Sequence, residues 1–98
     1  MTRLDVYQLP NGIKVVDVQA GPLDYIATHV VVPLVPLANA PPPIDDLNPV
    51  LDIDGIAYVM QTQAIAGIPK RELRQPIASL DRHHDRIVRA LDVLLMGY

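Results

Sequence analysis

The side chains in this chain that could do chemistry are a serine and three histidines, and none stands in a catalytic setting. Ser79 is the only serine, and no histidine or acid surrounds it in a nucleophile-elbow context. His83 and His84 are adjacent in a predicted helix, where their side chains diverge by about 100°, so they cannot share a tetrahedral metal without outside ligands. His29 lies in an apolar run, which is typical of a surface-side histidine or a hydrogen-bonded core histidine. We therefore expect no catalytic residue.

Two other kinds of site receive little support. The string Asp52-Ile53-Asp54-Gly55 has the first residues of a calcium loop but lacks the remaining ligand positions, and a hairpin turn explains it without an ion. The chain has no glycine-rich phosphate loop and no cysteine, which excludes a disulfide framework and a thiolate metal site. We expect no metal and no other cofactor.

Charge is unevenly distributed along the chain. Residues 1–62 carry Arg3 and Lys14 against seven aspartates, whereas residues 63–98 carry six basic residues against four acidic ones. The basic residues form two clusters, Lys70, Arg71 and Arg74, then Arg82, Arg86 and Arg89. A solvated helix face and a docking surface for an acidic segment of another protein both fit this pattern.

The stretch Asp81 to Tyr98 predicts the one long helix. Asp81 is a suitable N-cap, and Gly97 is a suitable end. The apolar stripe expected to face the core comprises Ile87, Val88, Leu91, Leu94 and Leu95. Met96 continues the polar face, so the helix is expected to present Met96, Gly97 and Tyr98 outward as an apolar tip for a partner.

The residues before the helix predict about five short strands. Expected strands cover Leu4 to Leu9, Ile13 to Gln19, Ala27 to Leu34, Val50 to Ile53 with Ile56 to Met60, and Ala64 to Ile68. Asn11-Gly12 predicts a two-residue hairpin turn, and Asp54-Gly55 predicts a second hairpin. Pro33 is expected at a strand end or a bulge, because proline cannot donate to a sheet.

Length and composition complete the fold prediction. The 98 residues are enough for a single domain, residues 1–98, whose core must be built from Val, Ile and Leu because Phe and Trp are absent. The predicted class is mainly β with a C-terminal helix, a small antiparallel barrel. Nothing in the sequence indicates a membrane span or an export leader, so the expected location is cytoplasmic.

Several strings, in this order, resemble the CcdB family, the toxins of type II toxin–antitoxin modules. They are Val6-Tyr7, Val16-Asp17-Val18-Gln19, Val31-Val32-Pro33-Leu34, Leu47-Asn48-Pro49-Val50, Ile68-Pro69 and the terminal Met96-Gly97-Tyr98. The likeness runs over almost the whole chain.

The resemblance implies an SH3-like barrel of the CcdB/MazF kind and a homodimer that is not an enzyme. It implies binding to the DNA gyrase A subunit, trapping of the gyrase–DNA cleavage complex, and neutralisation by a CcdA-like antitoxin. Toxin and antitoxin would together repress their operon, with operator DNA contacted only through the complex. The family's terminal Trp-Gly-Ile falls on Met96, Gly97 and Tyr98, and Asp92 one turn earlier corresponds to a gyrase-facing position. The two basic clusters are the expected contacts for the antitoxin's acidic tail.

Two alternatives stay open beside the gyrase poison. One is a MazF-like endoribonuclease toxin, whose groove would need basic and catalytic groups on strands that are acidic here. The other is a non-toxic chromosomal relative that keeps only antitoxin binding. Met96 in place of the family tryptophan removes the ring face that stacks on a gyrase arginine, while Tyr98 still offers a ring.

Overall fold

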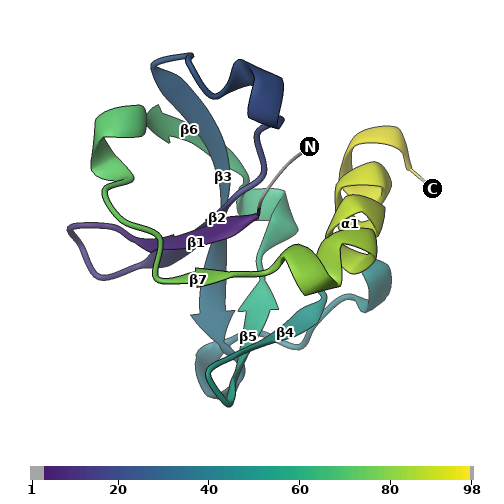
Figure 1. Ribbon diagram of the computed structural model, residues 1–98. Helices are drawn as coiled ribbons and strands as arrows, with labels where there is room; N and C mark the ends of the chain where they lie inside the picture. Colours follow the sequence, from purple (N-terminus) through teal and green to yellow (C-terminus); the bar gives the residue numbers. More distant parts are fainter. Residues whose placement is uncertain (1–3, 98) are drawn as a thin grey trace.

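The computed structural model describes residues 4–97, which form a curled antiparallel sheet and one α-helix (Figure 1). The elements are β1 (Asp5–Gln8), β2 (Lys14–Asp17), β3 (Thr28–Pro36), β4 (Val50–Ile53), β5 (Ile56–Met60), β6 (Ala66–Pro69), β7 (Ala78–Ser79) and α1 (His84–Met96). The strand order is β4-β5-β3-β2-β1-β7, and β6 pairs with β3 outside this path. This nearly closed small barrel with a C-terminal helix confirms the predicted fold class.

Strand β3 organises the barrel because it pairs with three other strands. It pairs with β6 over Thr28–Val31, then with β2, and finally with β5 from Leu34 onward. Pro33 lies inside this strand, so the prediction of a strand end or bulge was wrong. Its carbonyl accepts a hydrogen bond from the Gln61 N–H at 2.9 Å, on the side where β6 pairing has ended and β5 pairing begins. The missing N–H of proline therefore falls between two partner strands, where the sheet needs no donor.

Both predicted hairpins form, but by different turns. Asp54 and Gly55 have positive φ of 52° and 84°, as a two-residue type I′ turn requires. In the β1–β2 hairpin the Gly12 N–H donates to the Leu9 carbonyl at 2.8 Å, so Pro10 and Asn11 occupy the centre. Proline holds φ negative and excludes a type I′ turn there. Gly12, with φ 89°, follows the turn instead, which corrects the predicted two-residue Asn-Gly turn.

Short elements account for the remaining differences from the prediction. A 3₁₀ turn over Thr62–Ala64 delays β6, which was expected from Ala64, until Ala66. The two-residue strand β7 pairs with β1 through Asp5–Ser79 and Val6–Ala78, where only a connection to the helix was expected. Strand β7 forms one edge of the sheet, and β4 forms the other edge.

The core is mostly aliphatic, as predicted from the lack of Phe and Trp, but it also contains Tyr58 and Met60. Side chains from the barrel and from α1 form one buried cluster: Leu4, Val6, Val16, Val32, Leu34, Leu51, Ile53, Tyr58, Met60, Leu80, Ile87 and Ala90. Ile87 and Ala90 belong to α1, so the helix completes this core. Their burial fixes α1 to the barrel through the hydrophobic effect.

Helix α1 starts later than predicted. A 3₁₀ turn over Asp81–His83 comes first, and His83 precedes the helix without a side-chain cap hydrogen bond. Asp81 is the first residue of this turn, and the residue before the turn is Leu80. The prediction of Asp81 as N-cap was therefore wrong. Gly97, with φ 78°, ends the helix as predicted, and its N–H donates to the Val93 carbonyl. No helix in residues 4–97 has the length and apolar character needed to cross a bilayer.

The buried stripe of α1 is narrower than predicted. Ile87 and Ala90 are fully buried, and Leu91 packs against the core from its margin. Val88 and Leu95 are 40% and 67% exposed, which corrects their assignment to the core face. Successive helix residues differ by about 100° in direction, so a narrow contact through Ile87 and Ala90 leaves Val88 and Leu95 on the flank.

Candidate partner-binding surfaces

The end of α1 projects from the barrel into solvent (Figure 1). Met96 is 65% exposed, and Gly97 and Asp92 are exposed as well. The left-handed backbone of Gly97 turns the chain at the helix end. Tyr98, the last residue of the predicted tip, lies outside the described residues. In the described part of the tip, Met96 faces away from the core, as the helical pattern predicts.

The two basic clusters do not form one surface. The 3₁₀ turn Lys70–Glu72, which follows β6, lies on the far side of the barrel from α1 (Figure 1). Lys70 is engaged there, because its Nζ donates to the Asp24 carbonyl at 2.8 Å and lies 3.7 Å from the Asp24 carboxylate. Arg71 and Arg74 are exposed. A single partner that contacts both clusters must extend around the molecule.

Arg82 connects the two terminal strands of the sheet. Its Nη2 donates to the carbonyl of Asp52 in β4 at 2.7 Å, and its Nη1 donates to the carbonyl of Ser79 in β7 at 3.2 Å. Because β4 and β7 do not pair with each other, this guanidinium spans the gap where the barrel stays open. Both terminal nitrogens of Arg82 therefore already donate hydrogen bonds within the fold.

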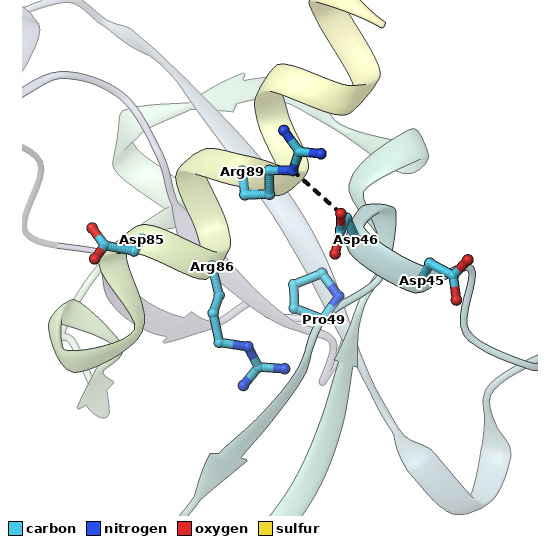
Figure 2. Close-up of a pocket in the computed structure, with 6 residues that line it drawn as sticks. All are labelled: Asp45, Asp46, Pro49, Asp85, Arg86 and Arg89. Carbon is cyan, nitrogen blue, oxygen red and sulfur yellow. Dashed lines mark hydrogen bonds and ion pairs between the residues drawn. The ribbon is translucent and has the colours of Figure 1, made fainter. Parts of the chain in front are cut away.

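Arg86 and Arg89 line a surface pocket of about 220 Å³ between α1 and the 3₁₀ turn Asp45–Leu47, called η3 (Figure 2). Asp45, Asp46 and Pro49 form the opposite wall. Arg89 Nε lies 3.3 Å from Asp46 Oδ2. Sequence reasoning missed this wall, because its aspartates lie in the irregular proline-rich stretch that carries no periodic signal.

A buried polar anchor holds η3 in place. The Asn48 side chain, in a residue 3% exposed, accepts from the Ile44 N–H at 3.0 Å and donates to the Met60 carbonyl at 3.0 Å. The Thr62 hydroxyl, fully buried, donates to the Leu47 carbonyl. These bonds satisfy polar groups that would be costly to leave unpaired, so the loop is positioned independently of its surface charges.

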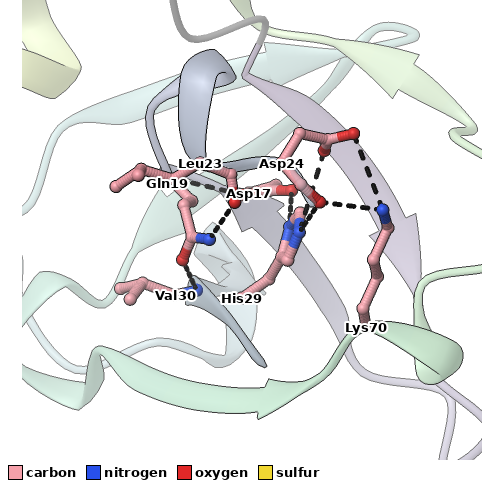
Figure 3. A network of polar contacts seen from close by, with 7 residues as sticks. All are labelled: Asp17, Gln19, Leu23, Asp24, His29, Val30 and Lys70. Atoms are coloured by element: carbon pink, nitrogen blue, oxygen red, sulfur yellow. Dashed lines mark hydrogen bonds and ion pairs between the residues drawn. The ribbon is translucent and has the colours of Figure 1, made fainter. Parts of the chain in front are cut away.

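A second polar group surrounds His29 at the start of β3 (Figure 3). His29 is 2% exposed, with Nδ1 2.7 Å from the Asp17 carboxylate and Nε2 3.0 Å from the Asp24 carbonyl. Both partners are acceptors, so both ring nitrogens must carry hydrogen, as in the imidazolium form. Burial acts to lower the pKa of His29, but these two hydrogen bonds and the charges of Asp17 and Asp24 outweigh it and raise the pKa.

Asp17, Asp24 and His29 are also the kind of group that binds metals, with ligand atoms within 4.8 Å of one another. The donor set does not fit a cation, because both imidazole nitrogens already donate and the Lys70 ammonium faces Asp24. The network instead fixes the loop between β2 and β3. This confirms that His29 is a hydrogen-bonded core histidine.

His83 has the opposite environment. In the part of the chain that the structure describes, its Nε2 is the one buried side-chain polar atom without a hydrogen-bond partner. Burial lowers the pKa of His83, repulsion from Arg82 and Arg86 lowers it further, and the charge of Asp52 opposes the shift. A neutral imidazole suits this position, since a proton would add a third positive charge beside two arginines.

The chain was compared with known proteins and protein families. No curated protein matches the chain. The family model described as CcdB protein matches residues 3–97, which is nearly the whole chain and includes all of the barrel and α1. The chain belongs to the CcdB family, whose members are toxins of toxin–antitoxin modules with a gyrase-related role.

Proposed function

We propose that this chain is a toxin that binds the DNA gyrase A subunit through the end of α1 and traps the gyrase–DNA cleavage complex. The site comprises Met96, Gly97 and Tyr98, with Asp92 one helical turn earlier. The action is protein–protein binding, without catalysis by the toxin and without a cofactor. The proposed setting is the cytoplasm, where gyrase acts.

The observation that carries this proposal is the 65% exposure of Met96 at the end of a helix whose other face is buried in the barrel. An exposed apolar side chain on a rigid helix offers contact area at little ordering cost. The family match extends to Gly97, so Asp92, Met96 and Gly97 belong to the matched region, whereas Tyr98 lies beyond it.

The tip departs from the family pattern at Met96 and Tyr98, and the change at Met96 removes an aromatic ring. Methionine has no ring face for a cation–π contact with an arginine, which contributes about 0.5–2 kcal/mol. Its polarisable thioether still packs on a guanidinium stem. This substitution favours a second candidate function, a non-toxic relative that keeps antitoxin binding alone. No observation in the described residues favours an endoribonuclease.

We further propose that an antitoxin of the CcdA kind neutralises the toxin by laying an acidic segment across its basic residues. Arg86 and Arg89 on α1, and Arg71 and Arg74 beyond β6, are exposed. Lys70 and Arg82 donate to backbone carbonyls, whereas Arg89 has only an exposed ion pair with Asp46, so Lys70 and Arg82 rank below the other four as antitoxin-binding residues. The toxin–antitoxin complex would repress its operon, with DNA contacted through the complex.

Deletion of residues 96–98 tests the tip. Met96 and Gly97 are exposed, so we expect the free energy of unfolding to change by no more than about 1 kcal/mol. Growth arrest on expression should nevertheless disappear, because interface energy concentrates in a few residues. The Met96→Trp variant should arrest growth more strongly than wild type, with binding to gyrase tightened up to about tenfold.

Thermal melting of wild type, the deletion and Met96→Trp must accompany the toxicity assay. A truncated protein that melts normally and still arrests growth would show that the tip is not the active surface. A wild-type protein that binds an antitoxin but never arrests growth, even as Met96→Trp, would favour the non-toxic relative.

A further inference from the structure

The pocket between α1 and η3 contains one arginine that is paired and one that is not (Figure 2). Arg89 is paired with Asp46 at 3.3 Å, and these side chains are 53% and 62% exposed. In residues 4–97 the Arg86 guanidinium has neither a hydrogen bond nor an ion pair. The two arginines lie three residues apart, so they occupy neighbouring turns of one helix face.

The pair between Arg89 and Asp46 is exchangeable. Ion pairs this exposed contribute little to stability and are weakened by salt. The η3 loop does not depend on the pair, because Asn48 and Thr62 hold it through buried hydrogen bonds. A carboxylate from outside can therefore replace Asp46 on Arg89 without a change in the fold.

The pocket also selects against loosely held anions. Three carboxylates, of Asp45, Asp46 and Asp85, line it beside the two arginines. A polyanion held only by general attraction is repelled by these groups. Direct bidentate contacts between a segment's carboxylates and the guanidinium groups are charge-assisted and oppose that repulsion.

We infer that this pocket is a docking site for an acidic peptide segment and that Asp46 is an internal competitor for it. One carboxylate of the segment takes the place of Asp46 on Arg89, and a second binds the unpaired Arg86. Asp46 thereby lowers the affinity of the free toxin for acidic segments. The identification of that segment as the antitoxin's tail rests on the proposed function.

The test is a titration of isotope-labelled protein with a capped hexaglutamate peptide, followed by NMR at low salt, with hexaglutamine as the uncharged probe. Asp46→Asn should tighten hexaglutamate binding by about two- to fivefold, the range of one exposed ion pair. Asp45→Asn is the matched control, because it removes the same charge from the same turn but frees no arginine, and asparagine tolerates the positive φ of Asp45. Arg86→Gln and Arg89→Gln should each weaken binding.

The double variant Asp46→Asn, Arg89→Gln decides the mechanism, because the gain from Asp46→Asn should vanish when Arg89 is absent. Equal tightening by Asp46→Asn and Asp45→Asn would overturn the proposal, since net charge alone would then explain both. A gain that persists without Arg89, or no hexaglutamate binding, would also overturn it. Growth arrest and antitoxin binding are measured separately, so a failure of the toxin function with the probe results intact leaves the pocket assignment standing.

Discussion

At the scale of single residues, folding favours opposite protonation states of His29 and His83. His29 donates from both ring nitrogens to acceptors, so the folded protein favours its charged form. In the described residues His83 has a buried nitrogen without a hydrogen-bond partner, and Arg82 and Arg86 repel a proton there, so the folded protein favours its neutral form. Both differences in pKa between the folded and unfolded states become differences in stability through proton linkage.

We predict that the free energy of unfolding passes through a maximum near pH 6.5, the ordinary histidine pKa. The pKa of His29 is raised on folding, so its contribution is present below 6.5 and is lost as the pH rises through its folded value. The pKa of His83 is lowered, so its contribution is present above 6.5 and is lost as the pH falls through its folded value. Urea unfolding from pH 5 to pH 9 measures this profile.

Single variants assign the two sides of the profile. His29→Gln should flatten the fall in stability on the alkaline side, and His83→Gln should flatten the fall on the acid side. Profiles that stay the same in both variants would show that other groups control the pH dependence.

Only part of this chemistry is visible in the sequence. For His29 in its apolar run the sequence leaves a surface-side and a hydrogen-bonded core histidine open, and the structure shows the second. Its partners are not predictable, because Asp24 reaches His29 from a 3₁₀ turn that only the folded β2–β3 connection positions. The role of Arg82 is hidden for a similar reason, since the carbonyl it binds lies in β4, thirty residues away.

At the scale of elements, closure of the barrel depends on the connection between β7 and α1. Arg82 in this connection donates to carbonyls of both terminal strands. Arg86, one helical turn further, bonds neither strand. The two residues have the same chemistry in one basic cluster but different structural tasks, which makes them a matched pair.

We predict that Arg82→Gln lowers the free energy of unfolding by about 1–2 kcal/mol, the cost of losing charge-assisted bonds to two carbonyls. Arg86→Gln should change it by no more than about 0.5 kcal/mol, as for other surface changes. Chemical denaturation of both variants and wild type measures the difference. Equal stabilities for the two variants would mean that the Arg82 contacts do not close the barrel.

The elements themselves differ in how far sequence predicts them. The β4–β5 hairpin was predicted with its observed bounds, because alternating residues flank an Asp-Gly turn. Strand β7 escaped prediction, because two residues carry no periodicity and its pairing with β1 is set by the folded barrel. Helix α1 was predicted but its buried stripe was too wide, since periodicity shows which residues are apolar and not how broad the partner surface is.

At the scale of the whole molecule, apolar side chains remain uncovered along one face of α1. Val88 and Leu95, seven residues apart on one helix face, are 40% and 67% exposed. The barrel is complete without them, because the buried cluster already takes Ile87 and Ala90 from the helix. An uncovered apolar flank beside a closed core is typical of a surface that a second protein chain covers.

We predict that the protein is a symmetric homodimer whose two-fold axis passes near the ends of the two α1 helices. A two-fold arrangement pairs the same flank with itself, so Leu95 of each chain would lie close to the axis. Stable dimers of this kind bury about 800 Å² on each chain. Such a dimer would also place the two copies of the proposed Met96 tip side by side.

Light scattering at tens of micromolar tests the assembly, with the dimer mass expected for wild type. Leu95→Glu should shift the mass to that of the monomer, because a carboxylate buried at the axis faces its own copy. Ile56→Glu is the control, since Ile56 is 54% exposed at the turn of the β4–β5 hairpin and the same change there should leave the dimer intact. A monomer mass for wild type would refute the dimer, and a dimer that survives Leu95→Glu would place its axis elsewhere on the barrel.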